Sequence, residues 1–130
     1  SVAEWNQLSD YVSSQSAYYC DNNHEFIAKA FAATSGWEEN ADPCAVGNNL
    51  SANNATGLTI LPAGFLDDGG SYLEFSTMTI LWSATEYNAS SGSCSYLGWY
   101  DAMLNDYLGL GKNIDHMTKA HGFSVRCVRN

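Results

Sequence analysis

The chain has 130 residues, 45% of them hydrophobic, a length and composition typical of one domain with a single core over residues 1–130. Five Lys and Arg residues against fourteen Asp and Glu residues give a formal net charge of −9, the opposite of the positive surface that binds nucleic acids or anionic membranes. No apolar run approaches the roughly 20 residues of a membrane-spanning helix. We therefore expect no nucleic-acid partner and no membrane insertion.

The first helix is predicted at the start of the chain. Ser1 followed by Glu4 has the spacing of a capping box, in which the two side chains satisfy the first backbone amides of a helix. Trp5, Leu8 and Val12 then recur at helical spacing. These residues predict an amphipathic helix. Because the chain opens at Ser1 and not at a methionine, it is compatible with removal of a leader or an upstream segment.

A second helix is predicted from about residue 25 to about residue 34, and Gly36 is placed to stop it. Its apolar side would consist of Phe26, Ile27, Ala30 and Phe31. Trp37 follows directly and, like Trp5, is expected to lie in the core, as most tryptophans do. Two helices are therefore expected in the N-terminal half.

The chain then changes character. Residues 38–55 are polar and without periodicity, which predicts a long surface loop. A β-like region begins near Leu58, the turn residues 67–70 separate two strands, and Leu81-Trp82 lies in an apolar strand. Residues 122–130 alternate as a closing strand, with Phe123, Val125 and Cys127 on the side that can be buried. Helices followed by short antiparallel strands predict an α+β domain with a small, mainly antiparallel sheet in its C-terminal half.

Four cysteines lack the spacing of a zinc site or of a C-x-x-C redox motif. Disulfides are therefore favoured, and four cysteines permit three connectivities. A bond between Cys20 and Cys44 would clamp the two polar ends of the second helix. Reduced thiols at these positions, Cys94 and Cys127 are the alternative, and would fit a reducing compartment.

The motifs of several enzyme classes are missing. There is no G-x-S-x-G elbow, no phosphate-binding G-x-x-x-x-G-K-[ST] loop and no D-x-D-x-D-G calcium loop. His24, His116 and His121 are scattered and are interpreted as surface residues, although His116 and His121 with Asp115 would be a weak alternative metal site. Asp67 and Asp68 are interpreted as solvated turn residues. We expect a protein that is not an enzyme, with no catalytic residues, no bound metal and no cofactor.

Residues 82–121 have the composition of a contact surface. Large amphipathic rings alternate there with Ser, Gly, Asn and Asp, which hydrogen-bond adaptably. The rings are those of Tyr87, Tyr96, Trp99, Tyr100 and Tyr107. Some of them must face inward, because side chains alternate along a strand. Aromatic rings bordered by amides and carboxylates suit either a protein or a carbohydrate ligand.

Five blocks, in this order, resemble one known family. They are Glu4-Trp5-Asn6-Gln7-Leu8, Gly36-Trp37, Gly57-Leu58-Thr59-Ile60-Leu61-Pro62-Ala63-Gly64, Leu81-Trp82-Ser83-Ala84-Thr85-Glu86 and Gly122-Phe123-Ser124-Val125-Arg126-Cys127-Val128-Arg129. By these blocks the chain is similar to the Fibrobacter succinogenes major paralogous domain family, over its whole length.

The resemblance implies a C-type-lectin-like fold in an extracellular, cell-surface or phage-virion protein that binds a ligand without catalysis. It also implies a variable protein of a diversity-generating retroelement, with residues 82–121 as the diversified segment. The ligand-binding face that it implies consists of Tyr96, Gly98, Tyr100, Asp106, Asn113, Asp115, His116 and His121. The alternatives are a fixed adhesin or a structural module.

The chain departs from the family pattern in two respects. Members usually begin with a strand carrying a Gly-Trp-x-Leu-Pro motif, whereas this chain starts at the E-W helix, so that strand is missing or lies upstream. No W-N-D or E-P-N triplet occurs, so calcium-dependent sugar binding is not expected. The fold also implies a less favoured enzyme of the formylglycine-generating type, for which Cys94 and Cys127 would be the reactive residues.

Overall fold

A computed structural model describes residues 1–102 and 115–127 of the chain. The elements are α1 (Val2–Ser13), α2 (Ala28–Phe31), a short 3-10 helix η1 (Leu50–Ala52), β1 (Phe65–Leu66), β2 (Tyr72–Leu73), β3 (Met78–Glu86), β4 (Ser91–Gly98) and β5 (Asp115–Thr118). Both α-helices lie in the N-terminal half and the strands follow them, all of them paired antiparallel. The predicted α+β class is confirmed.

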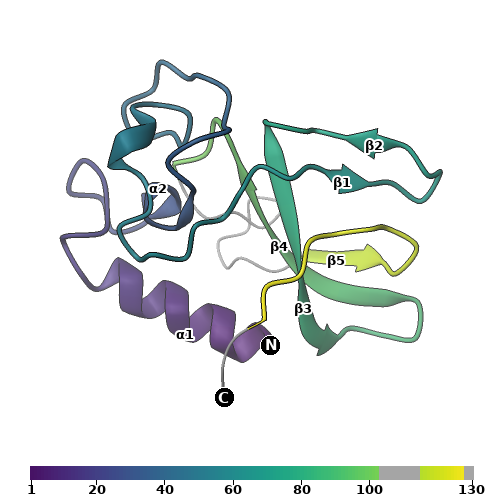
Figure 1. Cartoon of the computed structure of the whole chain (residues 1–130). Helices are drawn as coiled ribbons and strands as arrows, with labels where there is room; N and C mark the ends of the chain where they lie inside the picture. Colours follow the sequence, from purple (N-terminus) through teal and green to yellow (C-terminus); the bar gives the residue numbers. More distant parts are fainter. Residues whose placement is uncertain (103–114, 128–130) are drawn as a thin grey trace.

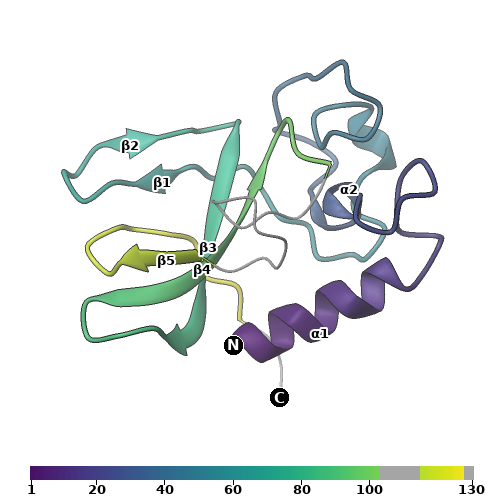
Figure 2. The same ribbon diagram turned by 180° about the vertical axis from the view of Figure 1, so that it is seen from behind.

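The strands form two sheets. β3, β4 and β5 make a three-stranded antiparallel sheet in that order, while β1 and β2 form a separate two-stranded ribbon. Figures 1 and 2 show the two helices and their loops on one side of β3 and β4, with β5 and the ribbon on the other. The central strands therefore divide the molecule into a helical side and a β side.

Helix α1 is confirmed together with its capping box. The Ser1 hydroxyl accepts from the Glu4 amide, and the Glu4 side chain accepts from the backbone of Ser1. Val12 is fully buried, and Trp5 and Leu8 are partly buried against the main core. The helix buries the apolar side that its spacing predicts.

Helix α2 is much shorter than predicted. The backbone before it turns tightly, since the Cys20 amide donates to the Phe26 carbonyl at 3.0 Å and Asp21 and Asn22 have positive φ angles. After Phe31, Ala32 is extended and forms a bridge with Ile60. The apolar run of residues 26–33 therefore enters the core partly as extended chain, because pairing with residue 60 replaces the last helical turn.

The polar loop of residues 38–55 is not wholly a surface loop. Residues 44–47 and Asn53 are buried. The Asn53 side-chain amide donates to the carbonyls of Ala33 and Val46, both at 3.1 Å. Because an amide side chain here satisfies backbone groups that water would otherwise bind, irregular chain can be buried.

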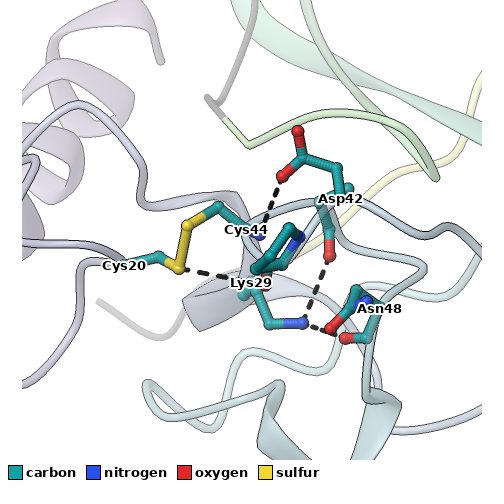
Figure 3. Close-up of a disulfide and its surroundings, with 7 residues drawn as sticks. Cys20, Lys29, Asp42, Cys44 and Asn48 are labelled. Atoms are coloured by element: carbon teal, nitrogen blue, oxygen red, sulfur yellow. Dashed lines mark hydrogen bonds between the residues drawn. A yellow bond between two sulfur atoms is a disulfide. The ribbon is translucent and has the colours of Figure 1, made fainter.

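A disulfide and a lysine also fix the same loop (Figure 3). Cys20 and Cys44 are joined, which confirms the predicted pair. The Lys29 ammonium donates to the carbonyls of Ala45, at 3.2 Å, and Asn48. Partial burial lowers the pKa of Lys29 from its ordinary value.

Two apolar clusters lie on the two sides of the sheet. The larger, on the helical side, is built from the two helices, the buried loop and the side chains of Leu81 and Leu97. The smaller, on the β side, consists of Ile80, Cys94 and Phe123, with Trp82 and other half-buried residues around it. Alternate residues of β3 and β4 therefore serve different clusters, as the two-residue period of a strand requires.

The closing segment is less regular than predicted. Gly122 bridges Leu66 and Ser124 bridges Leu81, but these are isolated bridges and not a continuous strand. Phe123 is buried, whereas Val125 and Cys127 are exposed. The prediction of one buried face is wrong beyond Phe123, because the described chain has left the sheet after Ser124 and the next alternate residues, Val125 and Cys127, are exposed.

Candidate functional site

The free end of the three-stranded sheet is the candidate site. We define the sheet tip as residues 82–93 and 116–119, where β3 turns into β4 and β5 ends. The Asn88 carboxamide oxygen accepts from the amides of Ser90 and Ser91, at 2.9 and 2.8 Å. The Lys119 amide donates to the Ser90 carbonyl at 2.9 Å. These bonds fix the turn and join it to the end of β5.

Two aromatic rings stack on one face of the tip. The Tyr87 and His116 rings are 3.6 Å apart between centroids and inclined by only 8°. Both residues are exposed, and Tyr87 keeps 58% of its surface accessible. Ser93, which pairs with His116 in the sheet, has its hydroxyl 3.5 Å from Nδ1 of that imidazole. The pair is therefore an ordered, solvent-facing aromatic surface with hydrogen-bonding groups beside it.

The tip also contains a hollow of about 250 Å³. It is lined by the second half of β3, the start of β4 and the residue after β5: Trp82, Ser83, Ala84, Thr85, Glu86, Gly92 and Lys119. Glu86 and Lys119 form an exposed ion pair, and the Lys119 ammonium also donates to the Ala89 carbonyl at 3.2 Å. Exposed ion pairs contribute little stability, about 0–1 kcal/mol. Each of the two groups can therefore leave its partner and bind a ligand instead.

Gly92 brings the backbone close to the indole in this hollow. A Cβ at Gly92 would lie 3.0 Å from the Trp82 ring, so a larger residue would displace the indole. Trp82 in turn lies 4.4 Å from the Phe123 ring, between centroids. The wall of the hollow is thus set by the smaller core cluster.

Some of the residues predicted to bind ligand are accessible. Tyr100 and His116 are exposed, and Tyr100 meets Trp99 edge to face, with centroids 6.0 Å apart. His121 is half-buried, with its ring 5.4 Å from Phe123, and its Nδ1 lies 3.2 Å from the Thr118 carbonyl oxygen.

The other predicted residues contribute less to the described surface. Tyr96 is half-buried against the smaller core cluster, and Gly98 is buried at the end of β4. The backbone of Asp115 pairs with that of Cys94 in the sheet. Asp106 and Asn113 lie outside the described residues.

The register separates two of the predicted residues. Ser93 and His116 pair and share one face of the sheet, whereas Tyr96, three residues further along β4, projects from the other. The structure therefore brings His116 together with Tyr87, and not with Tyr96. One binding face formed by all eight predicted residues stays a prediction.

Glu86, Asn88 and Lys119 were not among the residues predicted to bind a ligand. The polar sequence Glu86-Tyr87-Asn88 directly after the apolar β3 is the signal for a turn there. No sequence signal indicates that Lys119, 33 residues beyond Glu86, lies against it.

The remaining ionisable groups suggest no further chemistry at the tip. Among residues 1–102 and 115–127, no three His, Cys, Asp or Glu residues gather as a metal site would require. Cys94 is 3% exposed in the smaller core cluster, Cys127 is exposed, and both keep their thiols. None of the helices in the described part of the chain has the length and apolar character needed to cross a bilayer.

Comparison with protein families matches residues 1–129 to the Fibrobacter succinogenes major domain. The match spans all the blocks on which the sequence resemblance rests. No curated protein and no solved structure is similar enough to the chain to be matched with it. The chain belongs to the Fibrobacter succinogenes major domain family.

Proposed function

We propose that the chain is a non-enzymatic binding domain, displayed on a cell surface or a phage virion, whose sheet tip contacts a protein or carbohydrate receptor. The observation that carries the proposal is the exposed stack of Tyr87 on His116. Aromatic side chains with few rotatable bonds give large contact areas at small entropic cost. A stacked and hydrogen-bonded pair loses still less freedom on binding.

The groups around the stack suit polar ligands. Asn88 and the Glu86–Lys119 pair offer amide, carboxylate and ammonium groups within one small region, whereas the Ser93 hydroxyl is buried. Sugars and polar protein surfaces both combine ring-stacking faces with hydrogen-bonding groups. The ligand class is therefore expected to be recognised by stacking together with a few hydrogen bonds.

The disulfide supports an extracellular location. Bonds such as Cys20–Cys44 persist in secreted and surface proteins and are rare in the reducing cytosol. A displayed domain also needs the resistance to unfolding that a cross-link provides.

The thiols favour binding over catalysis. An enzyme of the formylglycine-generating type would need a reactive, accessible cysteine. Cys94 lies among Ile80, Trp82 and Phe123, in apolar surroundings that make a thiol inert. Cys127 is exposed and keeps its thiol, so only the burial of Cys94 bears on this choice.

Receptor binding can be tested on an array of bacterial and mammalian glycans and an array of extracellular proteins. Any ligand found should bind Tyr87→Ala at least about ten-fold more weakly, because the substitution removes one ring of the stack. Tyr11 is the matched control, since it is 57% exposed on α1. A ligand bound equally by wild type, Tyr87→Ala and Tyr11→Ala would contradict the assignment of the sheet tip.

Diversification is a separate part of the proposal and rests on the family resemblance. That resemblance implies a C-type-lectin-like fold whose residues 82–121 are rewritten by a retroelement. The encoding locus should then contain a near-copy of the coding segment beside a reverse transcriptase, with differences between strains confined to template adenines. An invariant segment without a template would leave a fixed adhesin or a structural module as the function.

A further inference from the structure

The β1–β2 ribbon exposes an unusual amount of apolar surface. We define the ribbon as residues 64–76, which run from Gly64 through both strands to the start of β3. Four of its large apolar side chains are exposed, namely those of Leu66, Tyr72, Leu73 and Phe75. Phe75 is 71% exposed, although a phenyl ring has no polar group that favours water. Leu66 and Tyr72 pair and share one face of the ribbon, whereas Leu73 projects from the other face. Together with Phe75 they give this short segment more exposed apolar surface than single scattered residues would.

The exposure of Phe75 is not caused by loose chain. On one side of it, the Met78 amide donates to the Glu74 carbonyl at 3.0 Å, and the Thr77 hydroxyl donates to the Glu74 carboxylate at 2.7 Å. On the other side, the Ser76 amide donates to the Pro62 carbonyl at 3.1 Å. The backbone is therefore tied down before and after the ring.

Glu38 ties the same loop to the helical side of the molecule. Its amide donates to the Ser76 carbonyl at 3.0 Å, and its carboxylate accepts from the Ser76 hydroxyl at 3.3 Å. Glu74 and Ser76, the two neighbours of Phe75, have φ angles of 57° and 67°, which side chains adopt only when the surroundings impose them. Phe75 is thus held outward in advance, and a partner would not have to order it.

The charged residues of the ribbon itself are all acidic. Between Lys29 and Lys112 the sequence contains no Lys or Arg, but nine Asp or Glu residues. Asp67, Asp68 and Glu74 belong to the ribbon, and Glu38 is hydrogen-bonded to its last residue. The carboxylates of these four residues therefore lie at the turn of the ribbon and beside Phe75, and like charges facing them would cost binding energy.

This charge decides between possible occupants. A second copy would bring another formal charge of −9 and the same acidic border, and an anionic bilayer would be repelled in the same way. A positively charged polypeptide complements the border, and apolar residues in it would cover Phe75 and its neighbours. Among the described residues no strand pairs with the outer edge of β2, so an extended segment could also add its backbone there.

We propose that the ribbon is a docking surface for an extended, cationic segment of another protein that alternates Lys or Arg with apolar side chains. The ribbon joins the N-terminal end of β3, whereas the sheet tip lies at its C-terminal end. Phe75 precedes and Tyr87 follows the nine residues of β3, which span roughly 27 Å along the strand, so these two exposed rings can contact different partners. The domain thereby has one surface for its receptor and another for its own carrier or assembly partner.

The first test titrates the full chain with two synthetic ten-residue peptides, one alternating Lys and Leu and one alternating Lys and Ser, at 0.15 M salt. We expect the Lys–Leu peptide to bind at least about ten-fold more tightly, and Phe75→Ser to reduce its affinity at least about ten-fold. Tyr11→Ser, which replaces an equally accessible ring on α1, should leave the affinity unchanged. Equal binding of the two peptides, or of the Lys–Leu peptide to wild type and Phe75→Ser, would overturn the proposal.

A second test separates local from overall charge. Glu38→Gln with Glu74→Gln, and Asp10→Asn with Glu25→Gln, each remove two exposed carboxylates and change the formal charge from −9 to −7. The first pair of substitutions should lower the affinity for the Lys–Leu peptide about five-fold, and the second pair should leave it unchanged. Equal weakening by both pairs would show unspecific attraction and overturn the proposal. Concentration-dependent dimerisation of the wild type that Phe75→Ser abolishes would overturn it in favour of a second copy.

Discussion

The loop-rich first half and the sheet-rich second half of the molecule differ in which side chains they bury and which they expose. Between Cys20 and Asn53, the chain has little regular structure, yet the side chains of Lys29 and Asn53 turn inward and bind backbone carbonyls. Between Leu66 and Tyr100, strands predominate, and large rings are exposed in β2 and in the segments next to the strands, namely those of Tyr72, Phe75, Tyr87 and Tyr100. The irregular half is the fixed support, and the regular half carries the surfaces that a partner can reach.

This difference has a physical cause. A loop can be buried only if its amides and carbonyls find partners, and Lys29, Asn53 and the Cys20–Cys44 bond supply the necessary constraints. The strands pair their own backbone groups, and Phe75 and Tyr87, which lie just outside β2 and β3, are held by hydrogen bonds of the adjoining turns, so their side chains can serve contact. Irregular chain is therefore no sign of mobility here, and regular chain is no sign of a purely structural role.

The largest expected effect comes from removing the disulfide. Cys20→Ser with Cys44→Ser should lower the free energy of unfolding by about 3.5 kcal/mol, because the bond closes a loop with a sequence separation of 24. Urea unfolding measures the loss. Reductant should destabilise the wild type similarly and leave the double variant unchanged. Amide exchange should rise first in residues 40–53; an equal rise throughout β3 and β4 would break the contrast between the two halves.

A smaller effect is expected in the second half, at Gly92. Gly92→Ala should cost about 1–3 kcal/mol, since the new methyl group lies against the Trp82 ring and the indole must move. Gly69→Ala is the control, because its Cβ would meet only the half-buried Asp67 carboxylate, at 3.3 Å. Thermal unfolding and tryptophan fluorescence measure the change. If Gly92→Ala is as stable as Gly69→Ala, the smaller core cluster is not tightly packed around Trp82.

The smallest expected effect is a dependence on pH. Burial lowers the pKa of Lys29 below its ordinary value of 10.5. Between the pH at which the folded protein loses this proton and pH 10.5, the unfolded chain therefore binds more protons than the folded one. The stability of the wild type relative to Lys29→Met should therefore rise as the pH increases from 7 towards 10.5. The measurement is the difference in the free energy of unfolding between the two proteins at each pH, in which the contributions of all other titrating groups cancel. A flat or falling difference would mean that Lys29 is not desolvated.

Local sequence signals predicted several elements correctly. The Ser1 and Glu4 capping box defined the start of α1, the residues 67–70 gave the ribbon turn, and Leu81-Trp82 indicated β3. Each of these depends on residues that are close in sequence, so the pattern contains the information that the structure needs. The exposed Tyr87 also came from a segment whose composition predicts a contact surface.

Other features depend on distant partners and could not be derived in this way. Helix α2 ends at Phe31 because Ala32 pairs with Ile60, and residues 44–47 of the predicted surface loop are buried because Asn53 and Lys29 bind nearby carbonyls. The closing segment leaves the sheet after Ser124, so its alternation did not bury Val125. In each case a contact made by tertiary folding overrode the local preference.

The sequence by itself thus determined the α+β class, the first helix, the ribbon turn and the family of the chain. The first three depend on the spacing of residues that are close in sequence, and the family depends on motifs that occur in a fixed order. Only the tertiary structure joined Cys20 to Cys44 and left Cys94 and Cys127 as thiols, set Tyr87 on His116 and turned Tyr96 to the opposite face of the sheet. Alternation along a strand fixes which residues share a face, but the register with the neighbouring strand decides which rings meet.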